Sequence, residues 1–103
     1  MHPSDEKKQP DHNLVERVQV GARLEKRMVK VLKGLAEYLD LSLGDLLEGI
    51  VLHAFAGEAP FSTLTLEQIA RLKEIYGMDY SVEMSHHLRE IVPEQHEEEL
   101  NAL

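Results

Sequence analysis

The 103-residue sequence contains no cysteine. Disulfides and thiolate metal sites are therefore excluded, and the chain is compatible with a reducing compartment. No apolar run approaches the roughly 18 residues of a membrane span. The first 13 residues are polar and lack the apolar core of a signal peptide. We therefore expect a cytoplasmic protein that does not enter a membrane.

The sequence also lacks the common catalytic and cofactor-binding motifs. It has no glycine-rich phosphate loop, no nucleophile elbow and no zinc-type spacing of cysteine and histidine. The one ligand-like cluster is His86-His87 with Glu90, in which His86 and Glu90 would share one face of a helix. Two ligands do not make a metal site. We therefore expect no metal, no cofactor and no enzymatic activity.

Charge is distributed unevenly along the chain, whose net charge is −8. Residues 7–33 carry eight basic and three acidic side chains, a net charge of +5, whereas residues 34–103 carry three basic and fourteen acidic ones, a net charge of −11. The basic half favours contact with a polyanion such as nucleic acid. It is equally compatible with a solvated helix face.

Three periodic segments follow one another between residues 17 and 55. Over residues 17–24 apolar side chains alternate with polar or small ones, which is the period of a strand with one buried face. Helical spacing then predicts a helix over about residues 25–40. After a short break, a second helix is predicted to begin with Ser42 as its N-cap and to end near Gly57. Gly34, inside the first helix, indicates close helix packing.

A lone strand leaves the hydrogen-bonding groups along both of its edges unpaired, so the predicted strand needs a partner. No second convincing strand is present, and the economical solution is a second copy of the chain related by a two-fold axis. The joint pattern resembles the ribbon-helix-helix family of DNA-binding proteins, the Arc and MetJ type, over about residues 18–55. It consists of the alternating strand, Leu24, Met28, Leu32, Leu35-Ala36, Leu41-Ser42 and Leu46-Leu47.

The resemblance implies a mainly α fold in which the N-terminal strand pairs with a second chain to form an intermolecular two-stranded antiparallel ribbon. The ribbon would enter the major groove of DNA. Its base-reading positions would be Gln19, Gly21 and Arg23, because an amide can bond adenine and a guanidinium can bond guanine. Gly21 leaves open either a close backbone approach to a base edge or a bulge. Ala22 and Glu25 also depart from the family pattern, in which a β-branched residue and often a proline occupy these positions.

Contacts to DNA phosphates are expected from two sources. The first is the set of basic side chains near the strand, Arg17, Lys26 and Arg27. By the resemblance, the second is the start of the second helix, where the N–H groups of Leu43 and Gly44 after Ser42 are unsatisfied and lie at the positive end of the helix dipole. A plain helix cap explains Ser42 equally well without any ligand.

The apolar positions of the strand and the two helices are expected to form the core of the dimer. These positions are Val18, Val20, Leu24, Met28, Leu32, Leu35, Leu46, Leu47 and Ile50. We divide the chain into a disordered polar arm (1–13), a ribbon-helix-helix dimerisation and DNA-binding module (14–58) and an acidic helical extension (59–103).

Within the extension, Thr65 and Gln68 form a capping-box pattern that predicts a helix over about residues 65–76, ended by Gly77. A short helix over residues 82–92, ended by Pro93, could follow. Tyr76 and Tyr80 could line a pocket or pack at the edge of the core. The extension could cover the module, bind a small effector or bind another protein.

The sequence therefore predicts a homodimeric, sequence-specific DNA-binding regulator, most simply a transcriptional repressor. The alternative is a dimeric protein-interaction module on the same fold, such as an antitoxin whose acidic C-terminal segment binds a basic partner protein. A basic, toxin-like reading frame beside this one would favour the alternative. A palindromic repeat upstream would favour the regulator.

Overall fold

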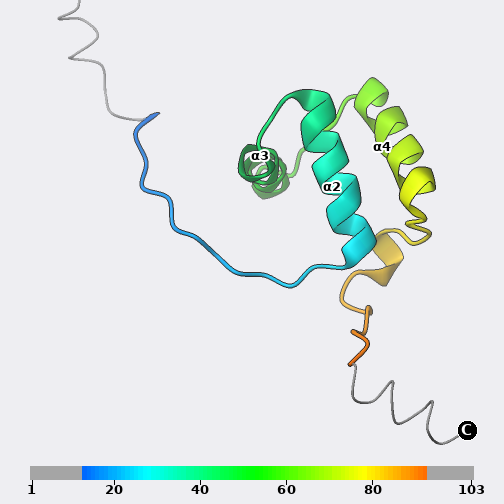
Figure 1. The fold of residues 1–103 in the computed structure, drawn as a ribbon. Coiled ribbons are helices and arrows are strands. Elements are labelled where there is room, and N and C mark those ends of the chain that lie inside the picture. Colours follow the sequence, from blue (N-terminus) through cyan, green and yellow to red (C-terminus); the bar gives the residue numbers. More distant parts are fainter. Residues whose placement is uncertain (1–12, 93–103) are drawn as a thin grey trace, which may run out of the picture.

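The computed structural model describes residues 13–92, and three α-helices lie in that range (Figure 1). They are α2 (Lys26–Leu39), α3 (Leu43–Phe55) and α4 (Thr63–Tyr76), and a 3-10 turn, η2 (Val82–Met84), follows them. The central helix is α2, which packs against both of the others and more extensively against α4. The described chain is mainly α, as predicted. None of its helices is long and apolar enough to cross a membrane.

Helix α2 begins and ends almost where the periodicity predicts. The carboxylate of Glu25 caps its start by accepting hydrogen bonds from the N–H groups of Arg27 and Met28. Asp40 ends the helix in the left-handed conformation, with φ of 59°. The next N–H, that of Leu41, then donates to the carbonyl of Ala36 at 2.8 Å and closes the last turn.

Helix α3 confirms the prediction that Ser42 is its N-cap. The Ser42 hydroxyl accepts a hydrogen bond from the N–H of Asp45 at 3.1 Å, and the Asp45 carboxylate places a negative charge in the first turn. At the other end Gly57, with φ of 70°, lets the N–H of Glu58 reach the carbonyl of His53 at 2.9 Å. A residue with a side chain would be strained in that conformation.

Helix α4 exists and ends at Gly77 as predicted, but the predicted capping box is wrong. Its N-cap is Ser62, whose hydroxyl accepts from the N–H of Thr65 at 3.2 Å, so the helix begins at Thr63. Both Ser62 and Thr65 are good N-cap residues. Ser62, the earlier of the two, is the N-cap, so the helix begins two residues before the predicted start.

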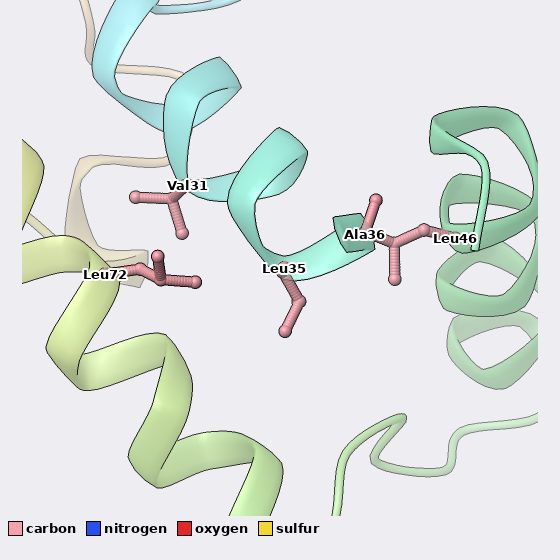
Figure 2. Packing of buried hydrophobic residues seen from close by; sticks show 5 residues of the cluster. All are labelled: Val31, Leu35, Ala36, Leu46 and Leu72. Carbon is pink, nitrogen blue, oxygen red and sulfur yellow. The ribbon is translucent and has the colours of Figure 1, made fainter. Parts of the chain in front are cut away.

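A small apolar core forms where the three helices meet. Figure 2 shows Val31, Leu35 and Ala36 of α2 lying between Leu72 of α4 and Leu46 of α3, and these five residues are the buried ones. Gly34 allows the closest approach, since a Cβ on it would lie 2.9 Å from a methyl carbon of Leu72. The prediction of close packing at Gly34 thus holds within one chain, between α2 and α4.

The single chain does not form the strand predicted over residues 17–24. Residues 13–92 contain no strand. In Figure 1 this segment extends from the start of α2 as a long open trace. A ladder needs a second strand, which the sequence assigned to a second copy of the chain. The intermolecular ribbon therefore stays a prediction.

The short helix predicted over residues 82–92 is wrong. Only Val82–Met84 forms a 3-10 turn, and His86 takes the left-handed conformation with φ of 67°, which interrupts any helix. Between Met84 and Leu88 the chain offers Ser85, His86 and His87, none of which supplies an apolar contact. Packing therefore cannot offset their weak helix propensity. Pro93, the predicted end of this helix, lies outside the described residues.

Candidate nucleic-acid interface

The predicted base-reading residues lie on the exposed segment ahead of α2. Gln19, Gly21 and Arg23 are all solvent-exposed, and no atom lies within 4 Å of where a Cβ on Gly21 would be. A base edge or a second strand could therefore approach the backbone there without a clash. The structure leaves both interpretations of Gly21 open.

Arg17, a predicted phosphate contact, forms an ion pair with α3. Its Nε and Nη2 atoms donate to the two carboxylate oxygens of Glu48 at 2.9 and 2.8 Å. The pairing raises the pKa of Arg17 and lowers that of Glu48, in both cases chiefly through the side-chain hydrogen bonds. Both side chains are exposed, so solvent screens this pair.

Arg23, a predicted base reader, is also paired with a carboxylate, and this one comes from the end of the described chain. Its Nε donates to Glu90 Oε1 at 3.2 Å, and its Nη2 donates to Oε2 of the same carboxylate. Hydrogen bonding raises the pKa of Arg23 and lowers that of Glu90. Glu90, a residue of the acidic extension, thus binds the side chain of Arg23 that we expect to face guanine.

Arg27 is the most heavily engaged of the three arginines. Its Nε donates to Glu25 at 3.0 Å, and its Nη1 donates to the Gly77 carbonyl at 3.0 Å and to Asp79 at 3.1 Å. Its guanidinium carbon also lies 5.4 Å from the centroid of the Tyr80 ring, a cation–π distance. Arg27 therefore fastens the start of α2 to the segment that follows α4.

Glu25 and Tyr80 complete this fastening. The Tyr80 hydroxyl donates to Glu25 Oε1 at 2.6 Å. Desolvation of Glu25 opposes its ionisation, but hydrogen bonds from Tyr80, Arg27 and the N–H of Met28 outweigh it and lower its pKa to about 2. Desolvation and the same bond to Glu25 raise the pKa of Tyr80 to about 12. We call Glu25, Arg27, Asp79 and Tyr80 the α2 clamp.

Two other predicted phosphate sites form fewer ion pairs and hydrogen bonds with the rest of the described chain. Lys26 is exposed on α2 and forms no ion pair with another residue of the range 13–92. At the start of α3 the N–H groups of Leu43 and Gly44 donate to no backbone carbonyl of the described range, while Ser42 serves as the cap. Both sites could accept a phosphate, although Asp45 lies beside the second one.

The predicted dimer-core residues divide into three groups by exposure. Two are buried, Leu35 and Leu46. Four are half-buried: Met28, Leu32, Leu47 and Ile50. The three on the N-terminal segment are exposed, Val18 at 82%, Val20 at 75% and Leu24 at 49%.

An apolar groove of about 440 Å³ lies between α2, α4 and η2. Met28, Leu32, Ile69 and Met78 are among the side chains that line it, and so is Tyr80. Of the two tyrosines considered for a pocket, Tyr80 thus lies in a groove wall. Tyr76 instead lies under Lys30, whose Nζ is 5.7 Å from the centroid of its ring.

The prediction that His86 and Glu90 share one face of a helix is wrong. The two residues do not share a helix, and the Glu90 carboxylate binds Arg23. Within residues 13–92 no group of three or more histidine, cysteine, aspartate or glutamate residues is arranged to hold a metal ion.

Sequence reasoning missed the acidic partners Glu48, Asp79 and Glu90 and the role of Tyr80. The partners of Arg17 and Arg23 are 31 and 67 residues away along the chain, so no local pattern could reveal them. The excess of acidic side chains after residue 34 was the one available signal.

Comparison of the chain with protein-family models, curated proteins and solved structures finds no match.

Proposed function

We propose that this protein is a homodimeric ribbon-helix-helix regulator that binds double-stranded DNA and represses transcription. Residues 17–24 of two chains would pair as an antiparallel ribbon in the major groove. The observation that carries the proposal is the exposure of Val18, Val20 and Leu24 on a segment that has no partner strand among residues 13–92. A second copy would cover these side chains and pair their backbone.

The second helix supports dimerisation in the same way. Val51, Leu52 and Phe55 of α3 are exposed, Phe55 at 83%. Apolar side chains that gather on one element, next to an apolar unpaired segment, are typical of a surface that another chain covers. The proposed core of the dimer thus joins α3 to the inward face of the ribbon.

The polar face of the segment supports DNA as the ligand. Gln19 and Arg23 alternate with the valines, so they would lie on the face opposite the dimer core. Arg17, Lys26 and Arg27 add positive charge beside them. The two copies in a dimer would bring about six basic side chains to phosphates, which is enough for a steep salt dependence.

The test is fluorescence anisotropy of labelled DNA duplexes with the full chain. We expect binding that weakens roughly 1,000-fold between about 50 and 200 mM salt. After selection of a preferred site, Gln19→Ala with Arg23→Ala should abolish the preference for it. Arg71→Ala is the matched control, because it removes the same charge from α4, where the side chain of Arg71 is exposed and donates a hydrogen bond to Gln68. Unchanged affinity of the double variant for the selected site would overturn the proposal.

The second candidate function is binding of a basic protein partner by the acidic extension, as in an antitoxin. The observation that favours it is the exposure of Val82, Leu88 and Ile91 on a segment that forms only one 3-10 turn. Such a segment could order against a partner. Co-purification with the product of an adjacent basic reading frame, lost on Leu88→Ser with Ile91→Ser, would support this function.

A further inference from the structure

We infer that the segment after α4 regulates the proposed DNA surface by competing with DNA for Arg23, whose guanidinium the Glu90 carboxylate occupies. The inference rests on the proposed function and adds a regulatory element that lies within the same chain. It gives the acidic extension a specific task, which is to hold Arg23 until DNA displaces Glu90.

The geometry at Arg23 makes Glu90 and a guanine compete for the same donors. Glu90 engages Nε and Nη2, one edge of the guanidinium, in a two-pronged arrangement of the kind that a guanine also accepts. While Glu90 is bound, a guanine cannot use that edge. The Glu90 carboxylate would also bring a negative charge close to the DNA phosphates.

The α2 clamp keeps this acidic segment within reach. Tyr80 and Asp79 fix the chain to Glu25 and Arg27 at the start of α2. Glu25 lies two residues after Arg23, and Glu90 lies eleven residues after Asp79. The competitor is therefore tethered to the surface that it occupies, which raises its effective concentration there.

The contact is weak enough for DNA to break it. The side chains of Arg23 and Glu90 are 82% and 57% exposed, and exposed ion pairs contribute little because water and salt screen them. Loss of one such pair should therefore change DNA affinity by roughly 1.5- to 5-fold per chain. This size suits an element that tunes affinity and does not block it.

The experiment compares five full-length proteins by anisotropy with one mixed-sequence duplex at about 50 mM salt. They are the wild type, Glu90→Gln, Glu83→Gln, Arg23→Ala and the double variant Arg23→Ala with Glu90→Gln. Glu83→Gln is the matched control, because it removes the same charge from the same segment, where Glu83 accepts a hydrogen bond from Ser81 and pairs with no basic side chain of residues 13–92. Circular dichroism checks that each variant keeps its helices.

We expect Glu90→Gln to strengthen binding clearly more than Glu83→Gln does, and to have no such extra effect in the Arg23→Ala background. Equal effects of the two glutamine variants would overturn the inference and leave the proposed function intact. So would a gain from Glu90→Gln in the Arg23→Ala background that is as large as its gain in the wild type and larger than the gain from Glu83→Gln. Failure of all five proteins to bind DNA would overturn the proposed function and the inference with it.

Discussion

The helical body, residues 26–76, and the two segments that flank it are held in place by different forces. In the body, side chains or left-handed residues close both ends of the helices, and five apolar residues are buried between them. The flanking segments, residues 13–25 and 77–92, contain no α-helix. They are joined to the body and to each other mainly by hydrogen bonds and ion pairs of charged side chains, and Met78 adds an apolar contact with the core.

This difference separates the part of the chain that has a buried core from the part that we expect to bind. Burial of one large apolar side chain contributes about 1.5–3 kcal/mol, whereas an exposed ion pair contributes about 1 kcal/mol or less. The body is therefore the more stable region. The flanking segments expose both valines and arginines, so they have interactions to offer to a second chain or to DNA.

The largest expected effect is loss of a core side chain. Leu35 is 2% exposed at the centre of the body, and Leu35→Ala should lower the free energy of unfolding by about 2–5 kcal/mol. Leu64→Ala is the control, because Leu64 is 72% exposed and its truncation should change stability by about 0.5 kcal/mol or less. Urea denaturation measures both. Equal losses would show that the body lacks the core described above.

The α2 clamp should have a smaller effect. Tyr80→Phe removes the hydrogen bond to Glu25 and should cost about 1 kcal/mol of stability, since the partner is charged but partly exposed. Tyr38→Phe, on the exposed side of α2, serves as the control. If both variants unfold at the wild-type urea concentration, the clamp does not connect the body to the segment after α4.

The clamp also predicts an acid dependence. Because the pKa of Glu25 is lowered from 4.5 to about 2 on folding, its contribution is fully present above pH 4.5 and is lost as pH falls toward 2. Stability measured over this interval should fall less steeply in Tyr80→Phe than in the wild type, because that variant lacks one of the bonds that lower the pKa. Parallel curves would contradict this origin of the shift.

The smallest expected effect compares two helical glycines. Gly49→Ala, where a Cβ meets nothing within 4 Å, should stabilise the body by up to about 1 kcal/mol through helix propensity. Gly34→Ala should give no such gain, because its Cβ would press on Leu72. Thermal unfolding of the two variants would show the contrast. An equal gain in both would mean that α2 and α4 are less closely packed than the structure shows.

The sequence was sufficient to predict the helices of the body because their signals are local. Apolar spacing located α2 and α3, while Ser42 and Gly57 marked the limits of α3. The start of α4 was misplaced because two adequate caps lie three residues apart. The helix after Tyr80 failed because His86 takes the left-handed conformation within the polar run Ser85, His86 and His87, which supplies no apolar side chain to offset the interruption.

The candidate site was only partly predictable. Strand alternation predicts that Gln19 and Arg23 are exposed, but in the single chain Val18 and Val20 are exposed as well, so the alternation itself stays a prediction. The carboxylates that bind the arginines do not follow from any local pattern. The packing of α4 on α2 was one of three alternatives that the sequence left open for the extension, because apolar positions such as Met28 and Leu32 could face either a second chain or α4. Only three-dimensional structure shows which partner is available within the chain.

The most direct test of the account is the oligomeric state in solution, measured by sedimentation equilibrium from about 1 to 100 µM. We predict a particle of about 23 kDa, twice the chain mass of 11.7 kDa. Val18→Asp with Val20→Asp should convert it to a helical monomer, whereas Gln19→Asp, on the opposite face, should leave it dimeric. A wild-type protein that stays at 11.7 kDa over the whole range would contradict the central claim that a second copy covers the N-terminal segment.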